Sequence, residues 1–531
     1  MLSPEYLETI AEGGEAIAEL LHHEIIQQIV ERIAIRLDRG EDYVLTARDK
    51  WQLEVLQDAG YLREDIEKVL AKYTGLMQKE IAEAMEAAGV ENMEWDDAVY
   101  RAAGLDPAPL AQSPYLVRLM QRAYEATVGE WINFTRTTAD ACQQSFVAAC
   151  DRAYTMVSSG AMGYSQAFAD AILRLANEGV AVVKYTKTDP VTGEERVHTD
   201  TIETATMRCI RTGVSQATAQ ITDARMDEMN WDIILVSSHF GARVTEKEDF
   251  TNHFWWQGKF YSKSGNNPRF PPFSVCGFGH VQGIHGANCR HHKGPGDGEH
   301  NPFKEFDSEK NKKEYELQQK QRTMERRIRK TKQECATLKK AVDSAGTEEG
   351  KQQVEEAYQK KVALLKKQNE AYNEFCEDNN LKRRSERMQI AKWDREQARA
   401  SIKAEKDYQA DLAKKEKYDK MIVEIREAAS VAKTAPVHIP PRGIEVESLS
   451  FDEKHINAER DHNVSREIAE KWIRESRVSI TVWNGKFERF YGTDGAVYVD
   501  MEEQHIRTAF GKAEFKEKVQ KLLEVLEKNG Y

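Results

Sequence analysis

Histidine and cysteine side chains, the ligand types that zinc prefers, crowd one irregular stretch of the sequence, residues 237–300. This stretch is rich in Gly, Pro and aromatic residues and has little helical periodicity, so side-chain or metal anchoring must hold its loops. A structural zinc ion would take about four ligands there. The candidates are His253, Cys289 and His291, with His239 or Cys276 as the fourth.

A second interpretation of the same stretch needs no metal. Imidazole side chains often serve as hydrogen-bond partners of the backbone, and Cys289 can be a buried small hydrophobe. No tight Cys-x-x-Cys pair is present to favour zinc. Trp256 and Tyr261 are likewise expected to fill a domain core rather than to stack on bases. This scaffold interpretation is the favoured one.

Side-chain types suited to RNA cleavage occur near the C-terminal end. A phosphodiester needs a histidine as general acid or base, with cationic and hydroxyl groups to stabilise the phosphorane charge. The candidates are His455 or His462, together with His505, Arg507 and Thr508. The alternative is an appended adaptor domain with exposed histidines, in which Arg507 pairs with a glutamate.

Other function classes are excluded by the sequence. There is no GxxxxGK[ST] phosphate loop, HExxH or GxSxG, which argues against an ATP-driven motor and a zincin-type protease. The net charge of -12 argues against a nucleic-acid binder along the whole chain. Seven scattered cysteines do not resemble a disulfide framework, and no signal peptide or 18-residue apolar run is present. We therefore expect synthesis in the cytoplasm and no membrane partner.

The elements that must position these residues favour a multidomain, mainly α fold with small α+β domains. Apolar residues at three- and four-residue spacing from Ile17 to Ile33 predict amphipathic helix in a helical N-terminal region, residues 1–176. Residues 177–300 form an irregular α+β domain. It begins with a hairpin that turns at Lys187–Gly193, and a helix at about 204–229 follows.

The rest of the chain divides into three parts. Heptad spacing and a central Gly-containing break predict a charged coiled-coil hairpin over residues 301–432. Residues 433–446 are a Pro-rich linker by composition. Residues 447–531 form a small α+β domain with a helix at Ser465–Glu475 and a hairpin turning at Asn484-Gly485.

Three sequence blocks in the central stretch carry a family resemblance. They are Ser237-Ser-His-Phe-Gly-Ala-Arg243, Asn252-His-Phe-Trp-Trp-Gln-Gly-Lys259 and Gly286-Ala-Asn-Cys-Arg-His291. In this order they resemble the phage minor capsid protein 2 family and, more distantly, head-morphogenesis proteins of the Mu type. The helix Met207–Thr218 fits the same family, and the resemblance covers roughly residues 1–300. Residues 447–531 look like a nuclease domain of the barnase, EndoU and colicin group.

The resemblance implies a structural virion protein of a tailed phage or prophage, present in few copies at the portal and assisting head assembly. Its partners would be the portal, other head proteins and packaged DNA. A second hypothesis is a capsid-borne carrier whose C-terminal domain is a metal-independent ribonuclease delivered with the DNA to act on RNA. A third is a zinc-stabilised module that contacts packaged DNA. The main body is not expected to be an enzyme.

Overall fold

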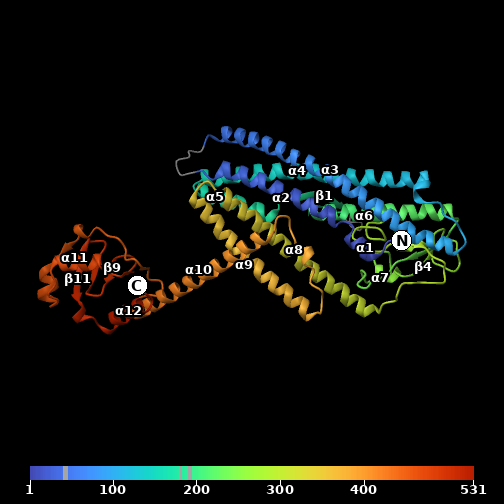
Figure 1. Ribbon diagram of the computed structural model, residues 1–531. Helices are drawn as coiled ribbons and strands as arrows, with labels where there is room; N and C mark the ends of the chain where they lie inside the picture. The colour runs from blue at the N-terminus through green and yellow to red at the C-terminus, as the bar shows by residue number, and fades with distance from the viewer. Residues whose placement is uncertain (40–45, 180–181, 189–193) are drawn as a thin grey trace. The chain divides into compact units, whose positions relative to one another are not determined.

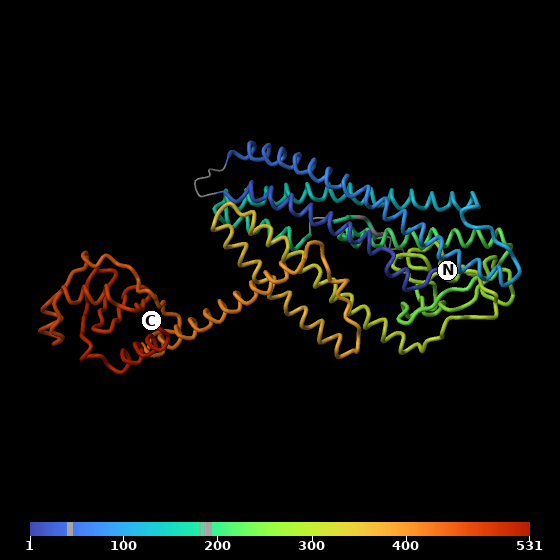
Figure 2. The backbone as a smooth tube through the Cα atoms, in the orientation of Figure 1, coloured from blue at the N-terminus to red at the C-terminus, as the bar shows by residue number. Residues whose placement is uncertain are grey.

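The computed structural model describes residues 1–39, 46–179, 182–188 and 194–531. The chain forms two compact units, Met1–Glu405 and Lys406–Tyr531. Figures 1 and 2 follow the first unit from blue to orange and the second from orange to red. Long helices make up most of the first unit and a sheet lies at the centre of the second, which confirms the predicted multidomain, mainly α fold with small α+β domains. The finer division into five segments stays a prediction.

Long helices form the N-terminal part of the first unit. Helix α4 begins where Ser113 accepts a hydrogen bond from the Leu116 N–H and Pro114 occupies the first turn, a favourable start for a helix. In α2 the residues Leu21, Ile25 and Ile29 are fully buried, as their spacing predicts. The helices are α1 (Pro4–Thr9), α2 (Glu12–Leu37), α3 (Arg48–Ala102), η1 (Leu110–Gln112), α4 (Pro114–Ser158) and α5 (Tyr164–Glu178).

An antiparallel hairpin and a long helix follow. Strand β1 (Val182–Thr188) pairs with β2 (Glu195–Thr201), as predicted, whereas residues 189–193 of the predicted turn lie outside the described residues. Thr201 caps α6 (Ile202–Glu228) by accepting a hydrogen bond from the Thr204 N–H. Helix α6 packs against α2, α3 and α4, so it crosses the interior of the bundle.

The stretch rich in His and Cys forms a small, irregular domain around a three-stranded antiparallel sheet of order β4-β3-β5. Trp256 and Tyr261 are buried in its core, as predicted, and pack with Tyr100 of α3 and Met226 of α6. This motif domain therefore shares its core with the ends of two long helices. Its elements are β3 (Ile233–Val236), α7 (His253–Trp256), β4 (Phe260–Ser262), η2 (Phe273–Cys276) and β5 (Lys293–Pro295).

The charged hairpin consists of α8 (Ser308–Ser344) and α9 (Glu348–Asp378), which pack along each other. Both helices contribute to the same hydrophobic core as α2 to α6. The hairpin is thus part of the body, because its apolar stripe packs against α2 and α5. The coiled-coil interpretation stays a prediction. After η3 (Ser385–Met388), α10 (Arg395–Ala428) begins in the first unit and ends in the second.

The second unit is a six-stranded sheet of order β6-β8-β9-β10-β11-β7. The end of α10 and α12 pack on one face, and α11 packs on the other. Residues 433–446, predicted as a linker, contain β6, which pairs with β8 at the sheet edge where proline is tolerated. The elements are β6 (Val437–His438), η4 (Val446–Ser448), β7 (Ser450–Phe451), η5 (Lys454–Glu459), α11 (Arg466–Arg474), β8 (Val478–Val482), β9 (Phe487–Tyr491), β10 (Gly495–Asp500), β11 (His505–Gly511), η6 (Lys512–Glu514) and α12 (Glu517–Lys528).

Within the described parts of the chain, every helix is too short or too polar to cross a bilayer.

Candidate functional site

Three of the predicted metal ligands meet in the motif domain. His253 lies at the start of α7, and Cys289 and His291 lie in the loop before β5. All three are buried, and one ligand atom from each lies within 4.8 Å of the other two. The Cys289 Sγ is 3.9 Å from Nδ1 of His253 and 3.7 Å from Nδ1 of His291. We call these residues the His253–Cys289–His291 cluster.

Hydrogen bonds at the far side of both rings fix their protonation. The His253 Nε2–H donates to the Gln282 carbonyl at 2.8 Å. The His291 Nε2 lies 2.9 Å from Oε1 of Gln257, and the same oxygen accepts the backbone N–H of His239. Since that oxygen is an acceptor, the His291 Nε2 carries the proton. Both rings therefore turn an unprotonated Nδ1 towards the thiol.

The other two predicted ligands lie beside the cluster but do not complete it. The His239 ring stacks on His291 with 4.4 Å between centroids, and its Nδ1 bonds the Phe240 carbonyl. Cys276 interacts with Tyr261 instead. Burial lowers the pKa of His239 to about 3, and burial followed by the Arg243 charge lowers the pKa of His253 to about 4. These two histidines are therefore neutral at physiological pH.

Local backbone geometry shapes the loop that carries Cys289. A Cβ on Gly283 would stand 2.1 Å from the Gly277 carbonyl oxygen, and one on Gly286 would stand 2.3 Å from that of Val281. Only glycine fits where backbone segments approach so closely. On the opposite side, the Asn252 side chain accepts the Trp255 N–H and starts α7 at His253.

The remaining histidines of this loop attach the motif domain to α6. The Ser215 hydroxyl is 2.8 Å from Nδ1 of His285, and the Thr218 hydroxyl is 2.8 Å from Nε2 of His292. Lys293 is buried and bonds Asp223 at 2.5 Å. These contacts agree with the interpretation that the histidines are scaffold residues, and they explain why the helix containing Ser215 and Thr218 accompanies the three blocks.

Arg290 joins the same loop to the rest of the body. It bonds Glu8 of α1 and Gln318 of α8. Glu8 also pairs with Arg322 and Arg387. Burial opposes ionisation of Glu8, but the surrounding arginines outweigh it and lower its pKa. The sequence did not indicate that Glu8 is the centre of this network, because its partners lie hundreds of residues away.

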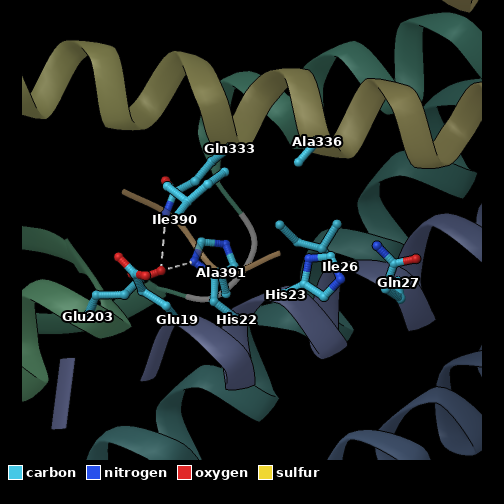
Figure 3. A pocket seen from close by; sticks show the side chains of 10 residues that line it. All are labelled: Glu19, His22, His23, Ile26, Gln27, Glu203, Gln333, Ala336, Ile390 and Ala391. Carbon is cyan, nitrogen blue, oxygen red and sulfur yellow. Dashed lines mark hydrogen bonds and ion pairs between the residues drawn. The ribbon is translucent and has the colours of Figure 1, made fainter. Parts of the chain in front are cut away.

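A second buried polar cluster joins α2, α6 and α8, and Figure 3 shows it lining a small cavity. Nδ1 of His22 lies 2.5 Å from Oε1 of Glu203, which also accepts a bond from Gln333. Burial, only partly offset by Arg329, raises the pKa of Glu19 to about 7. The cavity volume of about 20 Å³ suits roughly one water molecule and no larger ligand. This cluster therefore holds helices together.

Four of the five predicted ribonuclease residues of the second unit have separate partners, and the buried Thr508 hydroxyl has no hydrogen-bond partner among the described residues. His455 pairs with Glu459, His462 with Glu514 and His505 with the Ser450 hydroxyl. The Arg507 guanidinium lies over the Phe487 ring, and the Thr508 side chain is buried. Within the part of the chain that the structure describes, no hydrogen bond, ion pair or ring contact joins these five side chains to one another.

A different polar group, missed from the sequence, converges on the same sheet. Glu488 of β9 is fully buried, and one of its oxygens accepts the Thr481 hydroxyl at 2.6 Å. His438 and Arg442 each approach this carboxylate at 3.9 Å; the Arg442 side chain is exposed and the His438 side chain is half-buried. Because the Thr481 hydroxyl donates to Glu488, it accepts the His438 Nε2–H at 3.0 Å. The other carboxylate oxygen, Oε1, has no hydrogen-bond partner. Glu488 occupies a core-facing position in the alternating pattern of its strand. A charged residue at such a position is the sequence feature that could have indicated this group.

The helical body and the loop-rich domain attached to it by buried side-chain bonds make this a multidomain, mainly α protein with small α+β domains. The sequence model of the phage minor capsid protein 2 family matches residues 2–366. The chain belongs to this family, and its role is that of a structural phage capsid protein that associates with other head proteins in the virion. Comparisons with curated proteins and with solved structures gave no match.

Proposed function

We propose that the protein is a low-copy component at the portal vertex that acts in head assembly. The observation that carries this proposal is the agreement between the family match, residues 2–366, and one compact unit, Met1–Glu405. The matched region is thus a single body with a shared core, suited to act as one piece in a larger assembly.

The beginning of α3 offers a surface for that assembly. Trp51 and Val55 face the bundle and are buried, whereas Leu53 and Leu56, one turn apart, are 69% and 59% exposed. Leucines on one exposed face contribute little to folding of the isolated chain and are suited to a protein interface. We propose that this face contacts the portal.

The test uses DNA-filled particles purified from the host. Peptide mapping is expected to cover the whole chain at low copy, and cross-linking mass spectrometry is expected to join α3 to the portal. The double variant Leu53→Glu/Leu56→Glu should fold but fail to enter particles. Leu76→Glu, at a site of similar exposure further along α3, is the matched control and should enter. Absence of the protein from particles, or cross-links spread over the whole shell, would overturn the proposal.

A second candidate function is supported by the group around Glu488: a ribonuclease activity of the second unit, carried by the capsid protein. His438 is the half-buried imidazole of this group and would act as general acid or base. The Glu488 carboxylate would position it through the Thr481 hydroxyl, and the exposed Arg442 would contact the phosphate. This assignment differs from the five residues expected from the sequence.

The full chain would be incubated with single-stranded RNA and the products separated by gel electrophoresis. Cleavage should be lost in His438→Ala and should show an altered pH profile in Glu488→Gln. His505→Ala, outside the group, is the control and should keep the activity. Intact RNA with the wild-type chain, or equal loss in the control, would refute the candidate.

A further inference from the structure

We infer that His253, Cys289 and His291 bind one divalent transition-metal ion of the zinc class through two imidazole nitrogens and one thiolate. The three side chains are buried and their ligand atoms lie within 4.8 Å of one another. The inference concerns the motif domain alone and stands apart from both functions proposed above.

The two sulfur–nitrogen distances of the cluster are close to those of a zinc site. Bond lengths of about 2.3 Å to sulfur and about 2.0–2.1 Å to nitrogen in a tetrahedral zinc site place the two ligand atoms about 3.6 Å apart. The Cys289 Sγ lies 3.7 and 3.9 Å from the two Nδ1 atoms. A thiol has one proton, so it can serve only one of the two nitrogens and leaves the other buried acceptor unpaired.

The surroundings supply the second shell that metal-binding histidines need. A ligating imidazole usually donates its other N–H to a carbonyl or carboxylate, which fixes the ring and the tautomer. His253 donates to the Gln282 carbonyl, and His291 donates to the Gln257 side-chain oxygen. The backbone N–H of His239 holds that Gln257 oxygen in place. Both Nδ1 lone pairs are thereby prepared for an ion.

The donor set indicates which ion binds. A thiolate and two imidazoles suit zinc and disfavour magnesium or calcium, which take oxygen ligands. Binding replaces the Cys289 S–H bond by an S–metal bond and releases one proton to solvent. Three protein ligands leave a fourth position for a water molecule. The ion would tie α7 directly to the loop before β5.

The first measurement is the metal content of the untagged full chain by inductively coupled plasma mass spectrometry. One zinc per chain is expected in the wild type, falling at least tenfold in Cys289→Ala and in His253→Ala. Cys276→Ala, which removes another buried cysteine of the same domain, is the matched control and should keep its zinc. Zinc retained in Cys289→Ala, or lost equally in the control, would overturn the site.

A second measurement does not depend on how well the variants fold. The wild-type chain is stripped with a chelator and titrated with Co²⁺ alone. A thiolate-to-cobalt charge-transfer band in the near ultraviolet, saturating at one ion per chain and removed by adding Zn²⁺, is expected because Cys289 supplies the only thiolate in the cluster. A wild-type chain that contains no zinc and gives no such band would refute the inference.

Discussion

The carboxyl group of Glu19 is predicted to make the stability of the first unit depend on pH. Its side chain is only 11% exposed, and burial raises its pKa to about 7 although Arg329 lies 2.6 Å away. The ordinary pKa of a glutamate carboxyl group is 4.5. A raised pKa means that the folded state holds the proton more tightly than the unfolded state does. The contribution of Glu19 to the free energy of unfolding is therefore largest below about pH 4.5 and is lost as the pH rises towards 7.

The size of the effect follows from the shift. A change from 4.5 to about 7 corresponds to roughly 3 kcal/mol of unfolding free energy lost across that range. Glu19→Gln keeps the shape of the side chain but cannot ionise, so the variant should lack this loss. At pH 8 it should be more stable than the wild type by up to about 3 kcal/mol, reduced by the weakened bond to Arg329.

Urea unfolding of the full chain at several pH values between 5 and 8, followed by tryptophan fluorescence, measures this difference. Glu15→Gln, which removes another carboxylate bound to the same Arg329 nitrogen, is the control and should keep the pH dependence due to Glu19. If the wild type and Glu19→Gln have the same pH dependence, the carboxyl group of Glu19 is not destabilised by burial and the reasoning is refuted.

Two further perturbations test how the motif domain is held. Gly283→Ala should sharply lower the thermal unfolding temperature, because its Cβ would stand 2.1 Å from a backbone carbonyl oxygen, whereas Gly60→Ala in α3 meets no neighbour within 4 Å and should be neutral or stabilising. Asn311→Ala should lower the free energy of unfolding by roughly 3 kcal/mol, about 1 kcal/mol for each of the three hydrogen bonds of Asn311 to Gly241 and Ala242. Limited proteolysis of the Asn311→Ala chain should then cut near residue 241. A cleavage pattern identical to that of the wild type would show that the Asn311 bonds do not hold this loop.

Regular elements were predictable where one local signal dominated. The spacing of Leu21, Ile25 and Ile29 indicated a buried helix face, and the helix predicted at Ser465–Glu475 has Ser465 as its cap. Strand β6 was missed because two residues between prolines carry no alternation, and only pairing with β8 makes them a strand. Such pairing is a tertiary effect that composition does not encode.

The candidate sites, too, could be predicted only as far as local sequence determines them. The ligand types of the His253–Cys289–His291 cluster were predictable from composition, and the structure brings three of the five candidates together. Which of them converge depends on the fold of a loop with few regular hydrogen bonds. The group around Glu488 was missed because His438, Arg442 and Glu488 lie on separate elements and form no motif in the sequence. The histidines predicted in the second unit each have a separate acidic or hydroxyl partner, and their catalytic role stays a prediction.

The network around Glu8 has a consequence for the order of folding during synthesis. Its partners Arg290, Arg322 and Arg387 follow it by 282, 314 and 379 residues. At about 5–20 residues per second, the last of them emerges from the ribosome roughly 20–80 s after Glu8. During that interval the set of arginines around Glu8 is incomplete, and the network can close only when η3 has been made. The first unit therefore completes its folding late, after its helical hairpin is available, and a nascent chain stalled before Arg387 should remain sensitive to protease near α1.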